Sequence, residues 1–237
     1  NTAPDNCLTH NFYMHADSNV WDFLAKQFEE AYAMKDHLTH VSPRVQNRNL
    51  PYTPVTPSDT MQNEPDTDFD LSQNQEWVRR IFAKWKKSGT EEPEIIPLQI
   101  GAETVVCKNR YKYLDRCQND EVCICEMSQA DSAQVEKIIE IAETDPAGWR
   151  KTTLEERHRI MYEAANRLAD MRGDLIGCMC AVTGKTVIEG DVEVSEAVDY
   201  ARFYTTAMKK FAALDDIEIK PTGSILVISP WNFPCAI

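Results

Sequence analysis

The sequence lacks any uninterrupted apolar stretch approaching the roughly 18 to 20 residues that a helix needs to cross a bilayer. Its start (Asn-Thr-Ala-Pro-Asp) contains neither the basic nor the apolar region of a signal peptide, and it lacks an initiator methionine. Basic charge is scarce as well, because 38 acidic residues against 25 lysines and arginines give a net charge of -13. Such a surface is unsuited to phosphates and anionic headgroups, so we expect neither nucleic acid nor a membrane as a partner.

Metal-site and disulfide patterns are missing too. The eight cysteines do not show the paired Cys-x2-Cys spacing of a zinc site, and 237 residues can bury a core without disulfides. We therefore expect buried free thiols, no bound metal and a reducing compartment, either the cytoplasm or, alternatively, the mitochondrial matrix. His37 and His40 could ligate a metal together, but we interpret them as an exposed pair at a helix end. His158 is likewise expected to be exposed on a helix.

The composition, 43% hydrophobic and 27% charged, is typical of a soluble globular protein with one or two domains. Residues 1–94 form a helical and proline-rich linker region in our interpretation. An amphipathic helix is predicted at residues 18–36, and a second one carries Trp77, Phe82 and Trp85 and stops at Gly89. Between them, residues 41–70 hold five prolines among polar residues and predict an extended connector.

Residues 95–237 predict the first part of an α/β domain. Short β-leaning runs suggest a hairpin around Gly101 and a third strand at residues 122–127, and helical patterns follow from residue 131 to 214, with a break at Gly173. The apolar run at residues 224–229 predicts a strand buried on both faces of a parallel sheet. Only eight residues follow it, so we expect the rest of that sheet to lie outside this sequence.

Several motifs resemble the aldehyde dehydrogenase family in order and spacing. They are Gly-Lys-Thr-Val at 184–187, the acidic stretch 189–200, Pro-Thr-Gly at 221–223 and Ser-Pro-Trp-Asn-Phe-Pro at 229–234. The match is close to the branch that oxidises L-glutamate γ-semialdehyde, the pyrroline-5-carboxylate dehydrogenases. Residues 1–6, 63–69 and 74–77 resemble the linker of bifunctional proline-utilisation proteins. The resemblance implies a partial aldehyde dehydrogenase fold: a mostly helical N-terminal part, a short β-hairpin and the first strand of the cofactor sheet.

The resemblance also implies a chemistry: NAD-dependent oxidation of an aldehyde through an attacking cysteine thiolate and a stabilised oxyanion. Asn232 matches the oxyanion donor. The residues that match the cofactor-cleft wall are Ile228, Ser229, Pro230 and Trp231. Phe233 and Glu196 match positions near the substrate. Asn232 could instead be a simple turn residue, and Glu196 could belong to a solvated helix face. Cys235 is not the matching nucleophile, which lies downstream in the family, and we expect it to be packed.

The fragment is therefore expected to be inactive alone, as an incomplete part of a homo-oligomeric parent enzyme acting on a small aldehyde. Two alternatives remain: a non-catalytic accessory or assembly subunit, and one half of a split enzyme. Large apolar side chains such as Trp21, Phe28 and Trp85 need burial, which a partner chain could provide.

Overall fold

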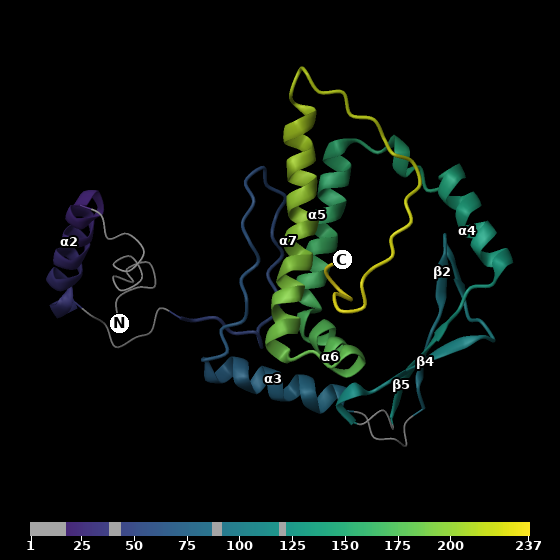
Figure 1. Cartoon of the computed structure of the whole chain (residues 1–237), viewed down its shortest axis with the longest axis horizontal. Coiled ribbons are helices and arrows are strands. Elements are labelled where there is room, and N and C mark those ends of the chain that lie inside the picture. The colour runs from purple at the N-terminus through teal and green to yellow at the C-terminus, as the bar shows by residue number, and fades with distance from the viewer. Residues whose placement is uncertain (1–17, 38–43, 87–91, 119–121) are drawn as a thin grey trace. The chain divides into compact units, whose positions relative to one another are not determined.

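The computed structural model describes residues 18–37, 44–86, 92–118 and 122–237, and the chain divides into two compact units, Asn1–Val45 and Gln46–Ile237 (Figure 1). In the first unit, the predicted helix is present as α2 (Ser18–Ala33), followed by a 3-10 turn, η2 (Lys35–His37). Leu24 is buried, whereas Trp21 and Phe28 are exposed. The proposed histidine pair lies outside what the structure describes, since His40 is beyond the described residues.

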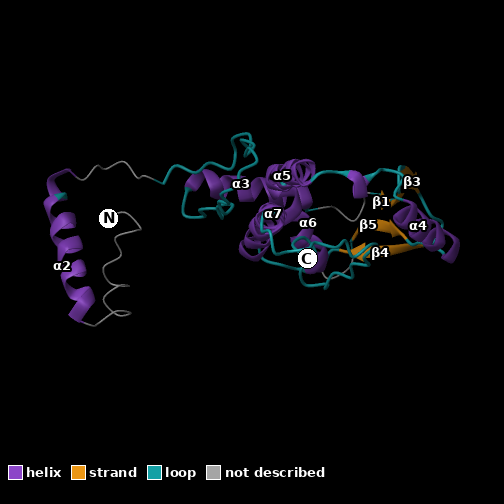
Figure 2. Cartoon of the chain, turned by 90° about the horizontal axis from the view of Figure 1, so that it is seen from above, coloured by secondary structure: helices purple, strands orange, loops and turns teal. Residues whose placement is uncertain are grey.

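In the second unit, helices α3 (Ser72–Trp85), α5 (Leu154–Asp170), α6 (Arg172–Thr183) and α7 (Val187–Ala212) pack together. The long helices α5 and α7 lie side by side, and α6 contacts both of them as well as α3 (Figure 2). Their shared core consists of small and branched side chains: Ala165, Ala169, Ile176, Met179, Cys180, Val194 and Val198. Among the described residues, no helix is both long and apolar enough to cross a bilayer.

Local sequence signals explain where these helices begin and end. Capping boxes open α5 at Thr153 and α7 at Thr186, so each cap side chain satisfies a backbone N–H of the first turn. Gly184 ends α6 with a positive φ of 72°, a conformation that glycine adopts without steric cost. The predicted break at Gly173 is wrong by two residues, because the chain turns at Met171 and Gly173 lies within α6, in contact with Trp77.

Two small sheets precede these long helices. The predicted hairpin is confirmed as β2 (Leu98–Ile100) paired antiparallel with β3 (Glu103–Val105). The predicted third strand, β5 (Cys123–Ser128), lies in a separate sheet of order β1-β5-β4. Its neighbours are β1 (Glu94–Ile96), which runs parallel to it, and β4 (Arg110–Leu114), which is antiparallel and which the pattern did not predict. Helix α4 (Ser132–Thr144) contacts β2, opens with a capping box at Asp131, and is followed by η4 (Trp149–Lys151).

The chain after α7 differs most from expectation. Residues 213–237 contain neither helix nor strand, and the predicted buried strand at 224–229 is wrong. Ile225, Leu226, Val227 and Ile228 are 71–83% exposed. An extended segment becomes a buried strand only where neighbouring strands and covering helices receive it, and this part of the chain has none in the described residues. The chain nevertheless combines helices with short strands, as the expected α/β class requires.

The exposure of His158 and of the cysteines was also predicted from the sequence. The expected exposure of His158 is wrong, because its side chain is only 4% exposed on α5. The described cysteines are all free; Cys180 is buried and Cys235 is half-buried against the core, as predicted, whereas Cys117 is exposed. Among the described residues there is no cluster of three or more metal-ligating side chains.

Candidate functional site

The motif that ends the chain folds into a turn. The backbone N–H of Phe233 donates to the carbonyl of Pro230 at 3.2 Å, which closes the turn over Trp231 and Asn232. Prolines on both sides of this segment restrict its backbone, because each ring fixes φ. Asn232 and Trp231 are both exposed at the corner of the turn. The turn interpretation of Asn232 is therefore correct for its backbone, and the exposed amide remains able to donate to a ligand.

The turn is attached to α7 through Glu193. One carboxylate oxygen, Oε1, accepts the backbone N–H groups of Cys235 at 2.7 Å and of Ala236 at 3.2 Å. The other oxygen, Oε2, accepts the Lys185 ammonium at 2.5 Å. Lys185 also lies over the Phe233 ring, 4.7 Å from its centroid. The motifs at 184–187 and 189–200 contain Lys185 and Glu193, but the sequence does not indicate a role for either residue, because Cys235 lies 42 positions from Glu193.

The Cys235 thiol does not have the environment of a nucleophile. Burial raises its pKa to about 11, and the nearby charge of Glu193 acts in the same direction. A thiol with such a pKa is almost entirely protonated near neutral pH, and the thiolate is the reactive form.

Residues 228–231, which match the cofactor wall, form an exposed extended strip. Ile228 is 83% exposed and the Trp231 ring is 64% exposed. An accessible backbone that runs into a tight turn beside an aromatic ring suits one wall of a nucleotide cleft. These residues therefore fit a bound dinucleotide as a single wall, without enclosing it.

Glu196 is placed apart from this turn. It is half-buried on α7, where its Oε1 accepts the Tyr200 hydroxyl at 2.8 Å, and that hydrogen bond raises the pKa of Tyr200. Glu196 lines a cavity of about 520 Å³ between the connector and α7. The cavity walls come from residues 61–66 and from α7, and among the described residues they exclude 228–233. The structure thus brings Phe233 to Lys185 and the following backbone to Glu193, but it does not bring Glu196 into the same pocket.

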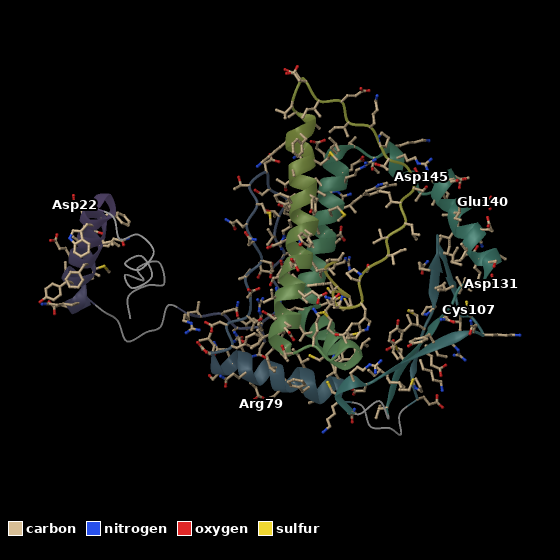
Figure 3. All side chains as sticks on the ribbon, in the orientation of Figure 1. Asp22, Arg79, Cys107, Asp131, Glu140 and Asp145 are labelled. Carbon is tan, nitrogen blue, oxygen red and sulfur yellow. The ribbon has the colours of Figure 1, made fainter. Side chains whose placement is uncertain are left out.

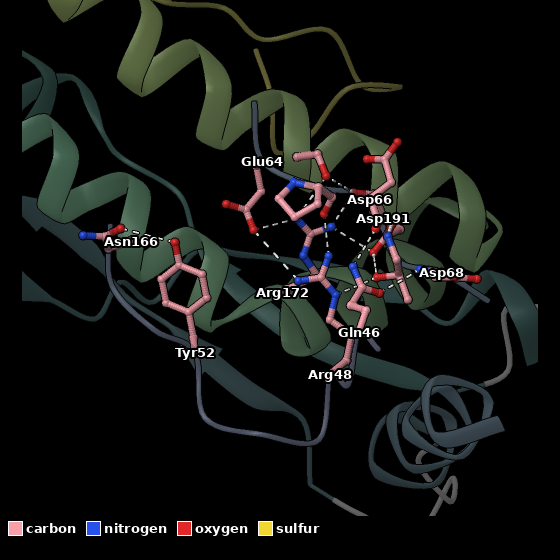
Figure 4. Close-up of polar contacts among 12 residues, drawn as sticks. Gln46, Arg48, Tyr52, Glu64, Asp66, Asp68, Asn166, Arg172 and Asp191 are labelled. Carbon is pink, nitrogen blue, oxygen red and sulfur yellow. Dashed lines mark hydrogen bonds and ion pairs between the residues drawn. The ribbon is translucent and has the colours of Figure 1, made fainter. Parts of the chain in front are cut away.

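A buried ionic network fixes α7 and α6 to the connector (Figure 4). Arg172 donates to the Asp191 carboxylate at 2.8 Å and to the Ser195 hydroxyl at 3.0 Å. The Asp191 carboxylate also accepts the backbone N–H of Thr67 at 2.6 Å, which joins the connector to α7. All four of these residues are buried. Their arrangement explains why the proline-rich segment, which has no helix or strand in its described residues 44–70, is nevertheless held in place.

The network also includes Glu64 and Tyr52 of the connector and Arg202 of α7. Glu64 receives the Arg202 guanidinium at 3.1 Å, and Arg202 in turn donates to the Tyr52 hydroxyl at 2.9 Å. Arg48, which donates to Thr67, has a pKa lowered first by burial and then by the neighbouring Arg172 charge. Buried ions need such partners, because each carries a desolvation cost of several kcal/mol. Nothing local in the sequence indicates the pair of Glu64 and Arg202, because the two residues are 138 positions apart.

Comparison with known proteins shows which family the chain belongs to. The profile of the aldehyde dehydrogenase family matches residues 107–237, which include the turn described above. The chain belongs to the aldehyde dehydrogenase family. Curated relatives named 1-pyrroline-5-carboxylate dehydrogenase include one from Geobacillus sp. (strain WCH70), 31% identical over 186 residues, and one from Bacillus pumilus, 28% identical over 186 residues. In both cases the match covers 74% of this chain and 35% of the relative, so the chain spans about a third of their length.

Solved structures show the same fold. The NAD-bound 1-pyrroline-5-carboxylate dehydrogenase from Thermus matches with a TM-score of 0.65 and 24% identity, covering 75% of this chain and 36% of that one. Proline utilization A (PutA) from Bdellovibrio bacteriovorus matches with a TM-score of 0.60 and 22% identity, covering 75% of this chain and 17% of that one. At these identities the likeness establishes the shared fold of the matched region.

Proposed function

We propose that this chain supplies the first part of an NAD-dependent dehydrogenase that oxidises L-glutamate γ-semialdehyde to L-glutamate in proline catabolism. The observation that carries the proposal is the turn at residues 230–233, which lies within the family match and presents the Asn232 amide to solvent. Relatives named 1-pyrroline-5-carboxylate dehydrogenase support the choice of aldehyde. In this proposal residues 1–94 are a linker region and residues 95–237 are the beginning of the dehydrogenase domain.

The proposed role of Asn232 is to stabilise negative charge. When a thiolate adds to the aldehyde, the carbonyl oxygen becomes an oxyanion, and the side-chain N–H of Asn232 donates a hydrogen bond to it. A neutral amide suits this task because it does not titrate. The attacking cysteine and the glutamate that activates water are expected from the part of the enzyme that this sequence does not contain.

Residues 228–231 are proposed to form one wall of the NAD site, with the Trp231 ring and the exposed backbone of Ile228 as the contacting groups. NAD, when bound, accepts the hydride that leaves the aldehyde carbon. On the substrate side, Phe233 is proposed to face the aliphatic chain of the aldehyde. Glu196 is proposed to lie near the substrate as well, although its cavity is separate from the turn.

The purified chain of 237 residues is expected to form no NADH from NAD and L-glutamate γ-semialdehyde, because it contains one oxyanion donor and one wall of the cofactor cleft. The measurement is absorbance at the NADH band over time, with a complete 1-pyrroline-5-carboxylate dehydrogenase as the positive control. Turnover by the purified chain would contradict the proposal that it is an incomplete catalytic unit.

A second candidate function, an accessory or split-enzyme subunit, is favoured by the apolar segment at residues 225–228. Its four side chains are 71–83% exposed, and a contiguous exposed apolar surface marks a site of protein contact. The intact mass of the protein from its native source separates the candidates. A mass near that of the relatives supports one continuous enzyme, and a mass near 27.1 kDa supports a separate subunit.

A further inference from the structure

We propose that Glu193 and Lys185 form a positioning pair that holds the turn of residues 230–233, and with it Asn232, against the N-terminal half of α7. The catalytic meaning of this pair rests on the proposed function of Asn232, whereas its contacts do not. The pair gives a role to two motifs of the sequence, the Gly-Lys-Thr-Val at 184–187 and the acidic stretch at 189–200.

The Glu193 carboxylate uses both of its oxygens. Its side chain is 2% exposed, so the charge must be compensated within the protein. Oε1 accepts the N–H groups of Cys235 and Ala236, and Oε2 accepts Lys185. Hydrogen bonds to an ionised group are roughly twice as strong as neutral ones. These contacts therefore fix the backbone immediately after Pro234.

The position of Lys185 is set by the junction of two helices. Gly184 ends α6 and Thr186 caps α7, so Lys185 lies in a tight turn whose backbone is determined on both sides. Glu193 stands two helical turns along α7 from Thr186, on the same side of the helix. The ammonium of Lys185 therefore reaches Glu193 and also the face of the Phe233 ring.

Together the two residues hold the turn on both sides of Pro234, at Phe233 through Lys185 and at Cys235 through Glu193. Asn232 precedes Phe233, whose N–H closes the turn, so these two attachments fix the backbone from which the Asn232 side chain projects. An oxyanion donor is effective only when it is oriented before the charge develops. The pair supplies that orientation from α7, a helix anchored by the ionic network around Arg172.

The pair is tested by amide hydrogen exchange of Cys235 and Ala236, followed by NMR on the 237-residue chain. E193A is expected to raise both exchange rates at least tenfold, because both N–H groups lose their acceptor. E193Q keeps an acceptor oxygen and is expected to restore most of the protection. The matched control is E163A, which removes an exposed glutamate from α5 and leaves both rates unchanged. Unchanged rates in an E193A variant with a native helical circular-dichroism spectrum would overturn the proposal.

A second readout covers the case in which E193A does not fold. In E193Q the Cys235 and Ala236 amide proton shifts should differ from those of the unmodified chain, because the charged acceptor of both N–H groups becomes a neutral amide of the same size. Amide proton shifts of Cys235 and Ala236 that are the same in both proteins would overturn the proposal. Neither readout uses turnover, so a failure of the positioning pair and a failure of the role of Asn232 are distinguishable.

Discussion

At the scale of single residues, His158 shows that the connector buries a helix face whose sequence predicts exposure. The pattern around it, with Glu155 and Arg159 nearby, predicts exposure. In the structure the Tyr162 hydroxyl donates to the carbonyl of Ser58, so the connector covers this part of α5 and buries His158. The imidazole Nδ1 has no hydrogen-bond partner, and its ring centroid lies 4.6 Å from that of Tyr162.

Burial of His158 predicts a pH dependence of stability. Burial lowers its pKa below the ordinary 6.5, the Lys209 charge lowers it further, and Asp59 and Glu155 oppose the shift. The unfolded chain therefore takes up this proton at higher pH than the folded chain, so the free energy of unfolding should fall as the pH drops below about 6.5. Urea unfolding between about pH 7.5 and 5 should show this fall, and H158Q should reduce it.

The comparison with H158Q has an internal control, because the other four histidines lie within residues 1–45 and are shared by both proteins. An identical pH dependence in the two proteins would show that His158 does not carry it.

At the scale of elements, local sequence signals were sufficient to predict the helices but not the contacts that hold the connector against them. Apolar periodicity predicted the helices between residues 131 and 214, and the prolines predicted the irregular connector. The buried partners of that connector were unpredictable, because Glu64 and Arg202 are 138 positions apart and polar pairing leaves no periodic trace. Figure 3 shows polar side chains along all of the described elements. Because polar residues are so widespread, the sequence alone does not indicate which of them are buried.

Removal of the Arg172 side chain should release the connector. R172M leaves Asp191 buried without its cation, and breaking a buried pair on one side typically costs about 3–5 kcal/mol. We expect a loss of that size in the free energy of unfolding, measured by urea denaturation, together with faster proteolysis within residues 46–70.

The matched control for this element is R167M. Arg167 is on α5 and its pair with Glu163 is exposed, so its loss should cost about 1 kcal/mol or less. Equal losses of unfolding free energy in R172M and R167M would contradict the conclusion that the buried network holds the connector in place.

At the scale of the whole molecule, the sequence predicted the family and the α/β class but not the environment of residues 224–229. The apolar run has the composition of a buried strand, yet burial requires a sheet, and the structure leaves these side chains exposed. The site shows the same division. Asn232 could be identified from its motif, whereas its attachment through Glu193 depends on a contact across 42 positions that only the folded chain reveals.

The most direct test of the proposed function is a measurement of kcat for L-glutamate γ-semialdehyde. It compares the protein as its native source produces it with the same protein carrying N232A. Loss of one oxyanion donor is expected to lower kcat by about 10²–10³-fold and to change KM little. N109A, which removes another exposed asparagine, is expected to keep full activity. An N232A protein with an unchanged kcat would contradict the account.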